Sequence, residues 1–237
     1  MGVGKPTLTF YGADMTLKLF FEAIIKFALG VILVGALIFL PAGTMDFYNG
    51  WLFMAVLFVP MFLAGIVMMV KNPALLRSRL DAKEKQGEQQ NVVKLSGLMF
   101  ILGFVLAGLD FRMGWSNMPM WLCYTGCVIL LISYGLFAEV LRENTWLSRT
   151  IEVQEGQTVV STGLYGIVRH PMYFATVFLF MAMPVILGSY ISFVVFLMYP
   201  YIISKRIRNE EEVLERELKG YSEYKNKVKY RMIPWIW

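Results

Sequence analysis

The chain consists of apolar runs long enough to cross a membrane, with polar connections between them. Hydrophobic residues make up 57% of the 237 residues and charged residues only 16%, a balance typical of helical membrane proteins. The sequence therefore predicts an all-α integral membrane fold, with about six transmembrane helices that include a short C-terminal hairpin. We expect the spans at residues 18–40, 51–70, 95–109, 120–140, 172–187 and 190–204.

The last two apolar runs differ from the others. Runs 172–187 and 190–204 are short for complete crossings and are joined by Gly188 and Ser189, which predicts a tight helical hairpin. A charged stretch with a helical period follows at residues 205–229. This stretch predicts a separate cytoplasmic C-terminal helix.

The polar segment before the hairpin, residues 141–168, is the longest polar segment after the basic one at residues 71–94. Within it, residues 152–160 alternate partly around Gly156 and predict an extended segment or a hairpin-like loop. We therefore divide the chain in two. Residues 1–140 hold the first four spans, and residues 141–237 hold the loop, the hairpin and the C-terminal helix.

Basic residues predict the orientation of the chain. Lysine and arginine gather in residues 71–94, in residues 141–169 and in the C-terminal tail, whereas residues 41–50 contain none. Loops rich in these residues stay in the cytoplasm. We expect a multi-pass protein with both termini on the cytoplasmic side. The first run lacks the cleavage pattern of a signal peptide, so we expect it to remain in the protein.

The composition argues against two kinds of site. A net charge of +5 is modest and fits cytoplasmic loops better than a nucleic-acid surface. Cys123 and Cys127 are the only cysteines and have no histidine near them in the sequence. Two thiols without histidine do not make a zinc site. We expect neither a nucleic-acid partner nor a bound metal.

A first cluster of chemically capable residues precedes the hairpin. Arg169 and His170, the only histidine of the chain, come directly before Pro171. Proline suits the first turn of a helix, whose free N–H groups and positive dipole end attract a carboxylate. The alternative is an interfacial anchor in which the arginine side chain reaches toward water.

A second cluster follows the hairpin. Arg206 and Glu210 are spaced to share a helix face, although a solvated ion pair is the alternative. The two clusters bracket the hairpin and should meet at one face of the membrane, where we place the active site. We expect the other glutamates of this stretch to be solvated and its tyrosines to be packed. These residues are Glu211, Glu212, Glu215, Glu217, Tyr221 and Tyr224.

The order and spacing of these clusters resemble a known family. Gly-x-Tyr-x-x-x-Arg-His-Pro-x-Tyr occupies residues 163–173, and Arg-x-x-x-Glu-Glu-x-x-Leu occupies 206–214. Tyr-x-x-Tyr and Arg-x-Ile-Pro follow at 221–224 and 231–234. Over residues 142–237 the chain resembles the isoprenylcysteine carboxyl methyltransferase (ICMT) family, which includes prokaryotic relatives and phospholipid methyltransferases.

The resemblance implies a membrane methyltransferase that uses S-adenosylmethionine without a Rossmann fold or a metal. The implied acceptor is hydrophobic or lipid-like and enters from the bilayer, and the implied reaction is carboxyl O-methylation of an isoprenylcysteine-like substrate. By motif position Arg206 and Glu210 would be catalytic, with Arg206 on the acceptor and Glu210 on the cofactor. The implied cofactor-binding residues are Gln157, Thr158, Val159, Val160, Tyr165, His170, Pro171, Met172, Tyr173 and Glu210.

Other interpretations stay open at this stage. A thiol or the amine of a phospholipid could replace the carboxylate as the acceptor. The C-terminal half also looks broadly similar to NADPH-dependent membrane reductases that act on steroids or lipids. A membrane scaffold without enzymatic activity is the third interpretation.

Overall fold

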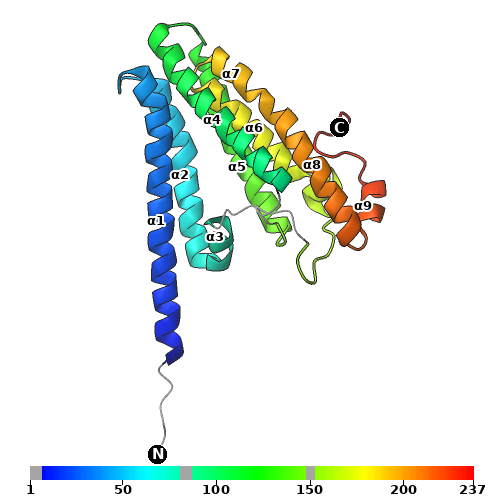
Figure 1. Ribbon diagram of the computed structural model, residues 1–237. Helices are drawn as coiled ribbons and strands as arrows, with labels where there is room; N and C mark the ends of the chain where they lie inside the picture. The colour runs from blue at the N-terminus through cyan, green and yellow to red at the C-terminus, as the bar shows by residue number, and fades with distance from the viewer. Residues whose placement is uncertain (1–6, 81–86, 148–152) are drawn as a thin grey trace, which may run out of the picture.

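The computed structural model describes residues 7–80, 87–147 and 153–237, and within these ranges it contains helices, turns and loops but no strand. Long helices lie side by side, and the C-terminal elements gather at one end of the bundle (Figure 1). The elements in chain order are α1 (Thr7–Ala42), α2 (Tyr48–Lys71), α3 (Pro73–Leu80), α4 (Gly87–Met113), α5 (Met120–Glu143), the 3-10 turn η1 (Gly163–Gly166), α6 (Pro171–Ile186), α7 (Tyr190–Phe196), α8 (Met198–Glu217) and α9 (Tyr221–Lys227).

These helices confirm the predicted membrane fold. The stretches long and apolar enough to cross a membrane are Leu17–Ala42, Tyr48–Lys71, Gln90–Met113, Met120–Glu143 and Tyr190–Glu217. The short apolar helix α6 has 16 residues, about 24 Å of helix at 1.5 Å per residue, against a hydrocarbon core of about 30 Å. α6 and the following α7–α8 path are the two arms of the expected hairpin.

The basic stretch at residues 71–94 is more helical than predicted. We expected a polar loop, but α3 and the start of α4 occupy most of its described residues. The Asn72 side-chain oxygen accepts a hydrogen bond from the Leu75 N–H at 3.1 Å, as a residue that caps a helix start does. The third span also extends past the predicted residues 95–109 to Met113.

The predicted boundary between the last span and a separate C-terminal helix is wrong. α8 continues through residue 205, because a buried stripe that includes Ile203 and Ile207 runs from its apolar half into its charged half. The helix ends shortly before Gly220, whose φ of 87° lies in the left-handed region that favours glycine. The short helix α9 follows and packs against α8.

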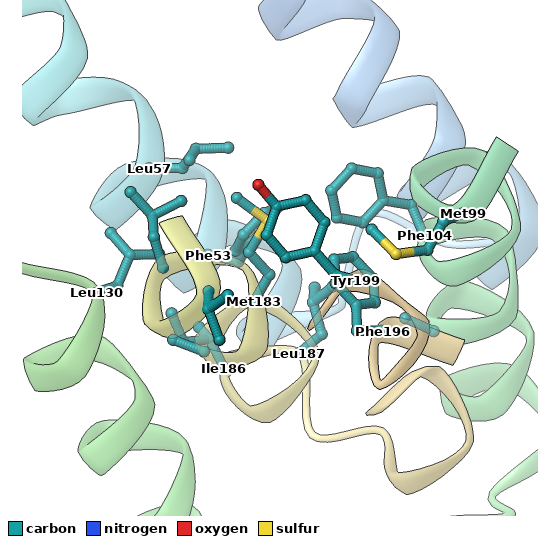
Figure 2. Packing of buried hydrophobic residues seen from close by; sticks show 14 of the residues in the cluster. Phe53, Leu57, Met99, Phe104, Leu130, Met183, Ile186, Leu187, Phe196 and Tyr199 are labelled. Carbon is teal, nitrogen blue, oxygen red and sulfur yellow. The ribbon is translucent and has the colours of Figure 1, made fainter. Parts of the chain in front are cut away.

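Aromatic and aliphatic side chains from several helices fill the core. Phe53 of α2, Phe104 of α4, Leu130 of α5 and Ile186 of α6 belong to one buried cluster (Figure 2). α5 and α6 share the most extensive contact of any two helices, and α4 packs against α1 and α7. The predicted division after residue 140 falls near the end of α5, before the loop that leads to α6. This division stays a prediction.

Glycines allow the helices to approach closely. A Cβ on Gly103 of α4 would lie 2.3 Å from the Phe196 ring in α7, and a Cβ on Gly126 of α5 would lie 3.0 Å from Ile186 in α6. Such contacts are typical of helices that pack in lipid. Large apolar side chains such as Leu29 and Ile32 of α1 point outward instead, as a lipid-facing surface requires.

Candidate active site

One end of the bundle contains a cavity enclosed by the loop after α5, the start of α6, the second half of α8, and α9. It encloses about 820 Å³ when the open space at its mouth is included. The lining residues are Asn144, Trp146, Leu147, Gln157, Thr158, Val159, Val160, Tyr165, Arg169, His170, Met172, Tyr173, Arg206, Glu210, Leu214, Leu218, Tyr221 and Tyr224.

The structure brings both predicted clusters to this cavity. Arg206 and Glu210 approach from α8, and His170, Met172 and Tyr173 approach from the start of α6. Tyr165 of η1 also lines the cavity. The predicted cofactor-binding residues that complete this wall are Gln157, Thr158, Val159 and Val160.

Pro171 is the one predicted site residue that does not line the cavity. It is buried at the first position of α6, where its fixed φ and missing N–H suit a helix start. The loop before α6 has a turn closed by the Gln157 N–H and the Gln154 carbonyl at 3.0 Å. This agrees with the expected loop at residues 152–160, except that residue 152 lies outside the described residues. The individual roles of the nominated residues stay predictions.

A buried ionic cluster lies beside the cavity and joins three segments. Glu211 of α8 is only 2% exposed. Its Oε1 lies 2.7 Å from Arg169 Nε, and its Oε2 lies 2.8 Å from Arg231 Nε. Arg169 Nη1 also donates to the carbonyls of Val228 and Lys229 at 2.7 and 2.8 Å. Buried charges require such complete pairing, because lost hydration is costly.

Backbone hydrogen bonds also join the C-terminal segment to the residues directly before α6. The Arg169 N–H donates to the Tyr230 carbonyl at 2.9 Å, and the His170 N–H donates to the Arg231 carbonyl at 2.7 Å. The Arg231 guanidinium lies 5.4 Å from the centre of the Trp237 ring. Arg169 is therefore fixed inside the protein, and the interpretation of this residue as an anchor that reaches toward water is wrong.

His170 lies between two glutamates of α8. Its Nε2 is 3.3 Å from Glu211 Oε1, and its Nδ1 is 3.8 Å from Glu210 Oε1. An ionised carboxylate only accepts hydrogen bonds, so the Nε2 atom carries the hydrogen in its contact with Glu211. Glu211 thereby sets the orientation of a ring that lines the cavity.

Arg206, Tyr173 and Glu210 form a chain of hydrogen bonds in the cavity wall. Arg206 Nε donates to the Tyr173 hydroxyl at 2.9 Å, and this hydroxyl donates to Glu210 Oε2 at 2.5 Å. A planar guanidinium binds carboxylates at two points, whereas a carboxylate accepts from hydroxyl and ammonium groups. One wall of the cavity thus offers sites for an anionic group and for hydrogen-bond donors.

Tyrosines form another part of the lining. The Tyr224 hydroxyl donates to the Tyr165 carbonyl at 2.7 Å, and the Tyr165 hydroxyl accepts from Asn144 Nδ2 at 2.9 Å. Tyr221 is 4% exposed, and its hydroxyl has no partner among the described residues. Burial raises the pKa of Tyr165 to about 12 and also raises the pKa of Tyr221 and of Tyr224. All three hydroxyls are therefore neutral near neutral pH.

Sequence reasoning missed the importance of Glu211. The expectation of a solvated side chain is wrong, because Glu211 lies four residues after Ile207 and three before Leu214, on the inward face of α8. Glu212 is exposed, and Glu215 and Glu217 pair at the surface with Lys225 and Arg216. Tyr221 and Tyr224 are packed, as predicted, in a small cluster with Leu218 and Val228.

Comparison with known proteins relates part of the chain to one family. Residues 124–216 match the model of the Isoprenylcysteine carboxyl methyltransferase (ICMT) family. The match runs from α5 into α8 and so includes both clusters. ICMT-family proteins are methyltransferases that use S-adenosylmethionine, and this chain is accordingly a membrane methyltransferase with that cofactor. A search of curated proteins found no match.

The cavity fits the polar groups of the ICMT cofactor, which has a carboxylate, an ammonium group, ribose hydroxyls and an adenine ring. The Met172 N–H in the first turn of α6 makes no hydrogen bond within the described part of the chain, so it is available to a carboxylate. The Glu210 carboxylate suits an ammonium or hydroxyl donor, and the Tyr221 hydroxyl is a free donor. Val159 and Leu214 provide apolar lining.

Proposed function

We propose that the protein transfers a methyl group to the carboxylate of a hydrophobic, isoprenylcysteine-like acceptor. The observation that carries this proposal is the Arg206 guanidinium, which lines the cavity and donates to Tyr173 beside Glu210. A guanidinium suits two-point binding of a carboxylate. α8 belongs to a stretch apolar enough to cross a membrane, so the apolar chain of the acceptor can lie along the helices while its carboxylate reaches Arg206.

When bound, S-adenosylmethionine would supply a methyl group activated by the sulfonium, which the acceptor carboxylate oxygen would take while the electron pair of the broken carbon–sulfur bond stays on sulfur. The nucleophile is already anionic, so the protein needs no base. Arg206 orients the carboxylate, and Glu210 and His170 hold the cofactor side of the cavity. Apolar side chains of the lining, such as Met172 and Leu214, exclude water from the cavity. These contributions are positioning and desolvation.

We also propose that the cavity faces the cytoplasm and that both termini lie on that side. The support is the excess of lysine and arginine in residues 71–94, in residues 141–169 and in the tail. The test places single cysteines at Glu155 and at Asn117 and labels them with a membrane-impermeant thiol reagent in intact cells. We expect labelling of the Asn117 variant alone, and the reverse pattern would invert the topology.

Calorimetric titration with S-adenosylhomocysteine tests the cofactor role of the cavity. We expect micromolar binding by the detergent-purified protein and its loss in His170→Ala and in Glu210→Ala. Thermal unfolding of the variants shows whether they remain folded. Unchanged affinity in both folded variants would place the cofactor elsewhere, and a parallel titration with NADPH tests the reductase alternative.

A methylation assay tests the acceptor. We expect turnover with an S-prenylated cysteine that has a free carboxylate and none with its amide, which lacks the nucleophile. Arg206→Lys keeps the charge but loses the planar two-point contact, so turnover should fall more than cofactor affinity. Equal losses would contradict the acceptor role of Arg206. Turnover with a prenyl thiol or an aminophospholipid in place of the carboxylate would change the acceptor class.

A further inference from the structure

A second hollow opens on the side of the bundle, between the start of α4 and the second half of α8, which pack against each other. These two segments lie next to each other in Figure 1. The hollow encloses about 1290 Å³ including the open space at its mouth. We call it the α4–α8 groove, and its lining residues are Asn91, Val92, Lys94, Leu95, Lys205, Arg208, Asn209 and Glu212.

The α4–α8 groove and the methyl-transfer cavity use different faces of α8. Lys205, Arg208 and Glu212 follow one another at intervals of three and four residues and so share one face. Arg206 and Glu210 lie on another face, toward the cavity. Of the residues that the structure describes, none lines both spaces. The groove is therefore a separate site on α8, the helix that also carries Arg206, the residue proposed to bind the methyl acceptor.

Positive charge dominates the groove. Lys94 comes from α4, Lys205 and Arg208 come from α8, and Glu212 is the only carboxylate among the described residues of the lining. Within the part of the chain that the structure describes, none of the three cations lies in an ion pair with a carboxylate. Three cations on two converging walls, against one carboxylate among the residues that the structure describes there, favour an anionic ligand.

The position of the groove identifies the kind of anion. Leu98 of α4 and Met198 and Tyr201 of α8 are large, exposed apolar side chains that lie beyond the groove residues, toward the apolar middle of their helices, and Tyr201 is 63% exposed. Lys205 Nζ lies 4.8 Å from the centre of the Tyr201 ring, at the level where the apolar surface ends. Basic pockets between membrane helices at this level suit phosphate head groups, whose acyl chains cover the adjoining apolar surface.

We propose that the α4–α8 groove binds the phosphate of an anionic phospholipid. Lys94, Lys205 and Arg208 surround the phosphate, while the acyl chains lie against Leu98 and Met198. A lipid in this position contacts α4 and α8 together and stabilises the side of α8 opposite the cavity. The groove thus takes a structural lipid, distinct from the methyl acceptor of the proposed reaction.

Native mass spectrometry and thermal unfolding in detergent test the proposal, with phosphatidylglycerol and phosphatidylcholine as probes. We expect phosphatidylglycerol to remain bound and to raise the unfolding midpoint more than phosphatidylcholine does. The double variant Lys205→Gln/Arg208→Gln should bind phosphatidylglycerol about tenfold more weakly, because each basic residue contributes substantially to anionic-lipid binding. Lys94→Gln, on the opposite wall, should weaken binding as well.

The matched control is Lys219→Gln/Lys227→Gln, which removes the same charge from exposed positions outside the groove. Equal loss of lipid in this control and in the groove variants would overturn the site in favour of non-specific attraction. Glycerol phosphate distinguishes a lipid from a free phosphate. If it stabilises the protein as well as phosphatidylglycerol does, the groove binds phosphate in general and the lipid assignment fails. Cofactor binding, measured in parallel, tests the other cavity independently.

Discussion

At the scale of single residues, the hydroxyl of Tyr221 leads to a direct prediction. It is buried against the cavity without a partner among the described residues, a state that costs about 1–3 kcal/mol. Tyr221→Phe should therefore leave the unliganded protein as stable or more stable. If the hydroxyl donates to the cofactor, the same change should weaken S-adenosylhomocysteine binding about tenfold, the equivalent of one hydrogen bond of about 1.4 kcal/mol. Thermal unfolding and calorimetry measure the two effects.

Tyr224→Phe is the control for this prediction. The Tyr224 hydroxyl already donates to the Tyr165 carbonyl, so its removal should lower stability by about 1 kcal/mol with a smaller effect on affinity. A loss of stability in Tyr221→Phe similar to that in Tyr224→Phe would show that Tyr221 has a partner within the protein.

Tyr165 predicts how stability depends on alkaline pH. Its pKa is about 12 in the folded protein, whereas an unperturbed tyrosine has a pKa of about 10. The unfolded chain loses this proton first, so the contribution of Tyr165 is complete below about pH 10 and is lost as pH rises toward 12. Unfolding midpoints should be measured from about pH 9 to about pH 11.5, a range that includes the unperturbed pKa of tyrosine. Over this range they should fall less steeply in Tyr165→Phe than in the unchanged protein. Identical slopes would contradict the shift.

At the scale of elements, Glu211 attaches the C-terminal segment to α6 and α8. Glu211→Gln removes the charge shared by Arg169 and Arg231, and loss of one partner from a buried ion pair costs about 3–5 kcal/mol. We expect a lower unfolding midpoint and faster proteolysis within residues 228–237. Glu212→Gln, at the adjacent exposed position, should change neither. A stable, protease-resistant Glu211→Gln protein would show that the backbone bonds are a sufficient attachment.

The same helix shows what sequence patterns predict well and what they do not. The apolar runs predict the spans because length and hydropathy alone decide whether a helix can cross a membrane. The spacing of Arg206 and Glu210 predicts a shared face, and both residues do line one cavity. The burial of Glu211 was not predicted, because its partners Arg169 and Arg231 come from distant segments and the ion cluster exists only once these have folded together.

Boundaries between elements were harder to predict than the elements themselves. α8 passes residue 205 without a break because its buried stripe continues, although the surrounding residues change from apolar to charged. α3 formed where the basic composition predicted a loop. The composition of a segment indicates whether it is surrounded by water or by lipid. The length of a helix also depends on its caps and on its packing.

At the scale of the whole molecule, glycine contacts set how closely the helices pack. Gly103→Ala would bring a Cβ within 2.3 Å of the Phe196 ring, and such overpacking typically costs about 1–3 kcal/mol. Gly97 lies on the same helix with nothing within 4 Å of a built Cβ, so Gly97→Ala should be neutral or stabilising by up to about 1 kcal/mol. Unfolding midpoints of the two variants in detergent measure the difference. Equal midpoints would show that α4 and α7 can separate without loss.

The outward faces of the helices have a consequence for the history of the sequence. In the most apolar part of α1 only 11% of the residues are buried, compared with 33% in the most apolar part of Tyr190–Glu217. A position that contacts only hydrocarbon accepts leucine, isoleucine, valine or phenylalanine equally well, so substitutions accumulate there without selection against them. The first helices should therefore diverge between species faster than the region around the cavity, and recognisable ancestry should survive longest there.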